Sequence, residues 1–188
     1  MTSLQDFQDT GALLTGHFRL SSGLHSDRYL QCARLLMWPQ RAETAGRELG
    51  SRLSEFSPRI IVSPALGGIL IGHETARALG LPFLFAEREN GVFALRRGFR
   101  LEPGQPVALV EDVFTTGKST REVIRTVSDL GARVVAAGSI VNRGLAQGAL
   151  PVPSRSLVTL EVPAWPEAEC PLCRQRVPLE APGSRYSN

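Results

Sequence analysis

The sequence predicts an α/β fold, in which helices cover both faces of a doubly wound, mostly parallel β-sheet. Short apolar runs rich in Val, Ile and Leu alternate along the chain with segments whose apolar residues recur every three or four positions. The runs are typical of parallel strands, which are buried on both faces, and the segments are typical of amphipathic helices. Their alternation favours βαβ units, which bring the carboxyl ends of the strands to one edge of the sheet.

The 188 residues are expected to form a single domain with three parts. Residues 1 to about 35 form an N-terminal hood, residues 36–162 form the α/β core, and residues 163–188 form an irregular, proline-rich tail with little visible chemistry. In the hood, Ser3 can cap a helix from residue 4 to about residue 10. Residues 17–31 alternate in polarity around a Ser-Ser-Gly turn, which predicts a β-hairpin.

The core is expected to begin with a long amphipathic helix that starts at Pro39, because proline is well tolerated in the first turn of a helix. An Asn-Gly pair at residues 90–91 predicts a further hairpin with a strand at 92–95. The other expected elements are strands at 60–62, 81–86, 107–110, 133–141 and 156–161, and helices at 69–79 and 121–130.

Residues 107–120, VALVEDVFTTGKST, combine a strand with an acidic pair and a hydroxyl-rich turn. We expect the chain to turn directly after Val110, so that Glu111 and Asp112 both lean into one crevice at the carboxyl end of the strand. Two such carboxylates suit a vicinal diol or a magnesium-bound sugar. The turn leads into a helix whose free backbone N–H groups can seat a phosphate. A P-loop is excluded, because Asp112 stands where its first glycine would be.

A second glycine-containing turn, SPALGG at residues 63–68, joins the first core strand to the next helix. Its two glycines permit backbone conformations that other residues avoid. A Gly-Gly turn alone can be a simple connection, but strand order in a doubly wound sheet brings this turn to the same edge as the acidic pair.

Charge and composition narrow the class of protein. The net charge of +3 comes from 20 arginines spread along the sequence and from Lys118, with no basic block. An anionic small substrate explains this excess as well as DNA would, so we expect no nucleic-acid partner. The sequence has no apolar run long enough for a membrane span and no signal peptide at its start, which favours a cytoplasmic protein without a membrane partner.

The cysteines are Cys32, Cys170 and Cys173, too few for a disulfide framework. Cys170 and Cys173 form a C-x-x-C beside prolines, with no second such pair in the chain. A four-cysteine zinc site would need a partner subunit, and a redox pair would normally lie near the start of a helix. We therefore favour two reduced thiols in a turn.

The stretch VALVEDVFTTGKS resembles the phosphoribosyl-diphosphate (PRPP) signature of type I phosphoribosyltransferases. The pattern F-x-L-x-S-G-x-x-S, formed by Phe18, Leu20, Ser22, Gly23 and Ser26, resembles the hood of orotate phosphoribosyltransferases. Ser21 stands where many relatives have a lysine, so Arg19 or Arg28 would have to replace that contact. The resemblance runs from about residue 18 to residue 143 and implies the same fold, with a β-hairpin as the catalytic loop.

The resemblance also implies a role for each motif. Glu111 and Asp112 would hold the ribose hydroxyls of PRPP, and Arg143 would hold the carboxylate of orotate, with Thr116 beside it. The pyrophosphate loop would consist of Ala65, Leu66, Gly67 and Gly68. The remaining PRPP contacts would come from Val113, Phe114, Thr115, Thr116, Gly117, Lys118 and Ser119.

Residues 87–101 occupy the place of the family's mobile catalytic loop, although an exposed hairpin with solvated charges explains the same pattern. Many relatives have lysines and a histidine there, whereas this chain has only arginines. Arg88 is our first candidate for a catalytic contact with pyrophosphate, followed by Arg96 and Arg97. A guanidinium can hold phosphate with two hydrogen bonds, but it is a poor proton donor.

The activity implied by the resemblance is transfer of phosphoribose from PRPP to orotate, which gives orotidine 5′-monophosphate and diphosphate in pyrimidine (UMP) biosynthesis. Mg²⁺ would be the cofactor, bound through PRPP with Asp112 as a candidate protein ligand, and no general base is expected. The resemblance also implies a homodimer whose catalytic loop acts in trans. Two alternatives remain open at this point: a phosphoribosyltransferase for a purine base, and a PRPP-sensing regulator. The regulator would need an added nucleic-acid-binding domain, for which the roughly seventeen residues before Phe18 are too few.

Overall fold

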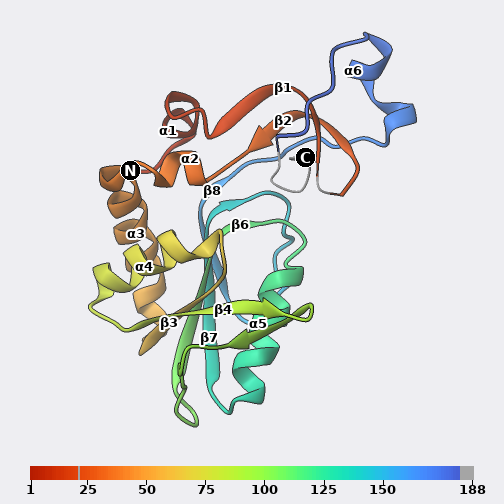
Figure 1. The fold of residues 1–188 in the computed structure, drawn as a ribbon. Helices are drawn as coiled ribbons and strands as arrows, with labels where there is room; N and C mark the ends of the chain where they lie inside the picture. Colours follow the sequence, from red (N-terminus) through yellow and green to blue (C-terminus); the bar gives the residue numbers. More distant parts are fainter. Residues whose placement is uncertain (21, 183–188) are drawn as a thin grey trace.

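The computed structural model describes residues 1–20 and 22–182. Its core is a six-stranded sheet in the order β5-β4-β3-β6-β7-β8, in which only β5 is antiparallel to its neighbour (Figure 1). The predicted α/β class with a mostly parallel sheet is therefore confirmed. The strands are β3 (Ile60–Pro64), β4 (Phe83–Glu89), β5 (Val92–Leu95), β6 (Pro106–Phe114), β7 (Arg133–Asn142) and β8 (Ser154–Thr159).

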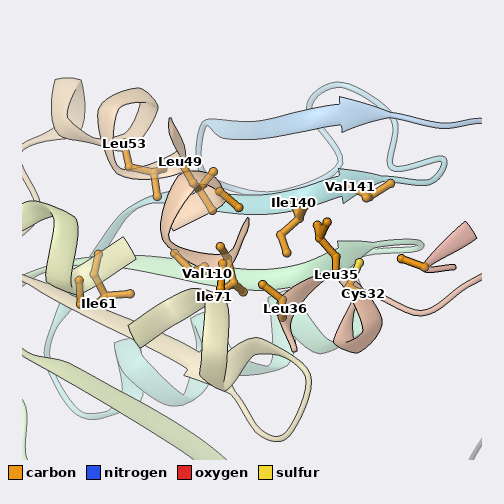
Figure 2. Close-up of a cluster of buried hydrophobic side chains, with 14 of the residues drawn as sticks. Cys32, Leu35, Leu36, Leu49, Leu53, Ile61, Ile71, Val110, Ile140 and Val141 are labelled. Atoms are coloured by element: carbon orange, nitrogen blue, oxygen red, sulfur yellow. The ribbon is translucent and has the colours of Figure 1, made fainter. Parts of the chain in front are cut away.

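Helices cover both faces of this sheet, as expected of a doubly wound fold. On one face lie α3 (Pro39–Leu53) and α4 (Gly68–Leu79), and on the other lies α5 (Lys118–Asp129). Each face has its own buried apolar cluster, and alternate residues of β6 contribute to them: Ala108 and Val110 pack under α3 and α4, whereas Val107 and Leu109 pack under α5. Figure 2 shows the first cluster, with Leu49 and Leu53 of α3 pointing toward the sheet.

The sheet strands differ from the predicted ones mainly in length. β6 runs to Phe114 and not to Val110, because its pairing with β7 continues through Glu111. The two carboxylates therefore lie inside the strand, and the expected turn directly after Val110 is wrong. β4 likewise extends to Glu89, and β8 begins at Ser154. The β4–β5 hairpin around Asn90 is confirmed, with Asn90 at a φ of 52°.

The hood contains α1 (Leu4–Asp9), a two-stranded sheet and α2 (Ala33–Leu36). Ser3 forms a capping box with Asp6, as its position before the helix predicted. β1 (Leu13–Arg19) pairs with β2 (His25–Leu30), which confirms the predicted hairpin, although β1 begins earlier than expected. The short α2 was not predicted, and its Leu35 and Leu36 belong to the first apolar cluster (Figure 2).

Residues 183–188 of the predicted tail lie outside the described ranges. The described part, residues 163–182, packs along the hood and is less irregular than expected. It contains the 3₁₀ turn η2 (Glu167–Glu169) and α6 (Pro171–Arg174), and it follows the hood hairpin in Figure 1. Backbone bridges join His25 to Trp165 and Phe18 to Glu180. The free C-x-x-C thiols are therefore held against the hood.

No helix in the described ranges, 1–20 and 22–182, is both long enough and apolar enough to cross a membrane.

Candidate functional site

The two carboxylates of β6 point to opposite faces of the sheet. Glu111 continues the face that packs on α5, and its Oε1 accepts a hydrogen bond of 3.1 Å from the Thr120 hydroxyl of that helix. Asp112 faces the other side, where its carboxylate lies next to Gly67 and its Oδ1 accepts the Val113 backbone N–H at 2.9 Å. Asp112 thus faces the SPALGG loop directly, whereas Glu111 is buried behind the start of α5.

Burial changes the acidity of both groups. The pKa of Glu111 rises from 4.5 to about 7, mainly because the carboxyl is buried and also because Asp112 is near; the Thr120 hydroxyl opposes the rise. Burial likewise raises the pKa of Asp112, and the Val113 N–H opposes this shift. A carboxyl whose pKa is raised on folding stabilises the fold below its ordinary pKa, and this contribution is lost as the pH rises through the folded value.

The Glu111→Gln variant should therefore gain stability relative to the parent as the pH rises. The gain in the free energy of unfolding should grow by about 2 kcal/mol between about pH 5 and pH 8, because only the parent must ionise a buried group. Urea unfolding at both pH values measures it. Glu102→Gln, which changes an exposed glutamate, should show no such trend, and a gain for Glu111→Gln that is equal at both pH values would contradict the assignment.

The hydroxyl-rich turn after β6 leads directly into the N-terminus of α5. Gly117 precedes the helix with a φ of 72°, a conformation that favours glycine, and a Cβ there would lie 2.8 Å from Leu145. The helix consequently begins at Lys118, three residues before the predicted start. Because Gly117 has no side chain to cap the helix, backbone N–H groups of the first turn remain available to an anion. Thr116 and Lys118 are exposed beside them.

The SPALGG loop approaches the acidic strand so closely that glycine is required. A Cβ on Gly67 would lie 2.8 Å from Oδ2 of Asp112, and a Cβ on Gly68 would lie 2.9 Å from the Val110 carbonyl oxygen. The loop leads into α4, and the peptide between Ala65 and Leu66 is cis. The two predicted loops therefore meet at the carboxyl edge of the sheet, as the strand order requires.

Arg143 follows the end of β7, and its backbone N–H bonds the Phe114 carbonyl at 2.7 Å. Burial lowers the pKa of its guanidinium, and the nearby Tyr29 and Cys32 of the hood oppose this shift. Burial and the charge of Asp112 raise the pKa of Cys32, and Arg143 opposes that rise. Arg143 and Asp112 thus share Cys32 as a neighbour, and Arg143 is a candidate anchor for an anion at the end of β7.

The arginines of the predicted catalytic loop are instead paired within their own neighbourhood. Arg88 forms an ion pair with Glu122 of α5 and stacks 4.1 Å above the Phe93 ring. Arg97 makes two hydrogen bonds of 2.9 Å to Glu87, and Arg96 lies 3.7 Å from Glu89. Among the described contacts, none joins these arginines to Glu111 or Asp112. Binding to pyrophosphate would require them to exchange these carboxylate partners.

The structure thus brings together Asp112, Gly67 and Arg143, with the turn at Thr115–Lys118 at the same edge, and leaves Arg88 apart. Three neighbours were missing from the sequence-based prediction: Thr120, Cys32 and Tyr29. Thr120 could have been found, because it follows the acidic pair by nine residues in the first turn of the helix. No sequence signal identifies the two hood residues, which approach the core only through tertiary packing.

The fold and the two loops define a type I phosphoribosyltransferase. The structure resembles a crystal structure of orotate phosphoribosyltransferase from Aeropyrum pernix, with a TM-score of 0.71 and 28% identity, over 83% of this chain and 92% of that one. An adenine phosphoribosyltransferase from Thermoanaerobacter pseudethanolicus shares the fold with a TM-score of 0.63 and 18% identity, over 71% of this chain and 88% of that one.

Curated relatives narrow this class. The chain is 49% identical over 178 residues to the orotate phosphoribosyltransferase of Thermotoga maritima, covering 95% of each chain. It is 50% identical over 179 residues to that of Pelotomaculum thermopropionicum, covering 95% of this chain and 94% of the relative. No family model matches the sequence. On the strength of these relatives, the chain belongs to the orotate phosphoribosyltransferase family.

Proposed function

We propose that this protein transfers the phosphoribosyl group of PRPP to orotate, giving orotidine 5′-monophosphate and diphosphate, a step of pyrimidine (UMP) biosynthesis. The observation that carries the proposal is the contact between Asp112 and the Gly67 backbone. It joins a carboxylate suited to ribose hydroxyls to a loop suited to a diphosphate. Family membership and the position of Arg143 support orotate as the acceptor.

Departure of diphosphate leaves positive charge on the ribose carbon and adds negative charge to the leaving group. Asp112 accepts hydrogen bonds from the ribose hydroxyls and stabilises the cationic sugar by its charge. Glu111 lies on the opposite face of β6 from Asp112, where it accepts the Thr120 hydrogen bond. It contributes a second negative charge once it has ionised. Backbone N–H groups of residues 66–68 bind the diphosphate, while that of Ala65 donates to the Ala86 carbonyl. Those of residues 115–119 bind the 5′-phosphate, so both ends of the sugar are held in position.

Orotate is held in the proposed complex by its carboxylate. Arg143 donates two parallel hydrogen bonds to this group, and the exposed Thr116 is a second candidate contact. The attacking ring nitrogen is acidic enough to lose its proton to solvent, so the chain supplies no general base. Its residues act by positioning the two substrates and by electrostatics.

The residues present suit Mg²⁺ as the cofactor. Asp112 offers carboxylate oxygen, which this ion prefers, but no group of three or more close ligands surrounds it among the described residues. This fits an ion held largely by substrate oxygens, with Asp112 as its candidate protein ligand. When bound, Mg²⁺ would neutralise charge on the diphosphate.

The base that the protein accepts distinguishes the proposed activity from that of a purine phosphoribosyltransferase. With PRPP and Mg²⁺ in excess, the purified chain should release diphosphate with orotate and not with adenine, guanine or hypoxanthine. A purine base has no carboxylate to pair with the half-buried Arg143, so the guanidinium would stay unpaired in that complex. Turnover with a purine but not with orotate would overturn the proposal, and binding of PRPP without any turnover would favour a sensor.

We further propose a homodimer in which the 87–101 hairpin acts on the partner's site. Mixing inactive Asp112→Asn chains with inactive Arg88→Ala chains should then restore about a quarter of the parent activity, because half of the dimers are mixed and each mixed dimer has one complete site. Sedimentation velocity measures the dimer, and an assay after co-refolding measures recovery. If the hairpin serves its own chain, mixed dimers contain no complete site and the activity stays at the level of the variants.

The proposed location of this activity is the cytoplasm. All three cysteines are free thiols, as expected in a reducing compartment. Fractionation of cells that express the protein at its natural level, with a cytoplasmic and an exported marker followed in parallel, tests the location. Recovery with the exported marker would contradict it.

A further inference from the structure

Two histidines of the hood and two cysteines of the tail meet at a single point, and we call these residues the His-Cys cluster: His17, His25, Cys170 and Cys173. His17 comes from β1 and His25 from β2, whereas Cys170 precedes α6 and Cys173 lies within it. One potential ligand atom from each residue lies within 4.8 Å of all the others. Three of the four residues are buried and Cys173 is half-buried.

Four of the six separations between these atoms match the edges of a tetrahedron around zinc, and the other two do not exceed 4.8 Å. Zn–N bonds of about 2.0–2.1 Å and Zn–S bonds of about 2.3 Å give edges of about 3.3–3.8 Å. His17 Nε2 lies 3.1 Å from His25 Nδ1, 3.5 Å from Cys170 Sγ and 3.7 Å from Cys173 Sγ. Cys173 Sγ lies 3.2 Å from His25 Nδ1. Four edges thus agree with the ideal values to within a few tenths of an ångström.

The outer hydrogen bond of His17 fixes the tautomer that a metal needs. Its Nδ1 lies 2.8 Å from the Val177 carbonyl oxygen, which can only accept a hydrogen bond. Nδ1 must therefore carry the proton, and Nε2 presents its lone pair to the centre of the cluster. A backbone carbonyl in this place is a common outer partner of metal-bound histidine, because it orients the ring.

Hydrogen bonds can join the four facing atoms only in pairs. The lone pair of His17 Nε2 can accept one well-directed hydrogen bond, although the ring nitrogen of His25 and two thiols all converge on it. Cys170 can donate to His17 Nε2 and Cys173 can donate to His25 Nδ1, so hydrogen bonds leave the atoms as two separate pairs. A cation at the centre satisfies all four atoms together.

We propose that the His-Cys cluster is a structural zinc site that fastens the tail to the hood. All four coordination positions come from protein side chains, so no position stays open for water or substrate, as is typical of structural sites. The ligand order is His-x₇-His followed by Cys-x₂-Cys, and all four ligands come from one chain. A metal site of this kind needs neither a second cysteine pair nor a partner subunit.

The surrounding backbone supports a fastening role. Next to the ligands, His25 and Trp165 exchange two hydrogen bonds of 2.8 Å, and the Glu180 N–H donates to the His17 carbonyl at 2.8 Å. The Ser26 hydroxyl donates to the Pro163 carbonyl at 2.6 Å. The metal would thus lie among backbone hydrogen bonds that already join the hood hairpin to the tail. Its binding energy would help to order the hairpin and the tail together.

Metal analysis of the 188-residue chain without a tag tests this proposal. Protein purified without chelators should contain about one zinc per chain, and Cys173→Ser and His25→Ala should lower this content at least about tenfold. Cys32→Ser and His73→Ala are matched controls, since Cys32 lies in the first apolar cluster and His73 is exposed on α4. Both controls should keep the zinc content of the parent.

Cobalt gives a measurement that does not depend on the folding of a variant. After zinc is exchanged for Co²⁺, the unmodified chain should show the strong visible bands of tetrahedral, thiolate-bound Co²⁺. Zinc removal by a strong chelator should also speed proteolysis within residues 163–182 several-fold, with zinc restoring resistance. A chain that purifies without zinc and gives only octahedral Co²⁺ spectra would overturn the proposal, as would a Cys170–Cys173 disulfide in the native protein.

Discussion

The Asp112→Asn variant is expected to lose about 10²–10³-fold of kcat/KM for PRPP, because it removes a charge that acts on the cationic sugar in the transition state. Asparagine keeps the shape of the side chain and can still accept the Val113 N–H bond of 2.9 Å. The loss should therefore appear mainly in kcat, with little change in stability. Steady-state kinetics together with thermal unfolding measure both quantities.

A matched control separates this effect from a general loss of negative charge. Asp129→Asn changes an exposed carboxylate at the far end of α5 and should leave kcat/KM unchanged. Gly67→Ala should resemble Asp112→Asn, because its new Cβ would lie 2.8 Å from the carboxylate and displace it. Asp112→Asn with parental kcat would remove the basis of the proposed mechanism.

The Arg143→Ala variant should lose the use of orotate and keep the binding of PRPP. A charged, two-point hydrogen bond contributes about 1.5–3 kcal/mol, so KM for orotate should rise by about 10–100-fold. The Kd for PRPP with Mg²⁺, measured by calorimetry, should stay within about twofold, because the phosphate loops and Asp112 are intact. The two measurements together assign the residue to the base and not to the sugar.

Two further variants sharpen this assignment. Arg143→Lys keeps the charge but not the planar pair of donors, and should recover only part of the affinity for orotate. Arg125→Ala removes an exposed arginine of α5 and should change neither constant. Unchanged KM for orotate in Arg143→Ala would contradict its role as the anchor.

Much of the fold could be predicted because β3, β6 and β7 are buried apolar runs and α3 and α5 have a clear helical period. The predicted turns also lie where glycine is needed, at Gly67 and Gly117. The end of β6 could not be predicted, because the pairing of polar residues with β7 depends on the neighbouring strand. The pattern 107–120 nevertheless identified the edge of the sheet where both loops meet.

Contacts between distant segments could not be predicted from the sequence. The C-x-x-C lies beside histidines that precede it by about 150 residues in sequence. Charge and position make Arg88 a catalytic candidate, but the sequence does not reveal that Glu122 of α5 lies beside it. Local patterns carry no information about such pairings.

The position of β6 between β3 and β7 in the sheet has a consequence for hydrogen exchange. The amides around Glu111 and Asp112 should exchange with deuterium only when the whole domain opens, whereas those of the β4–β5 hairpin at the sheet margin should exchange through local opening. The two carboxylates would then lie in the segment that opens last, and the β4–β5 hairpin would lie in the segment that opens first. The two parts of the proposed site are therefore expected to differ in local stability.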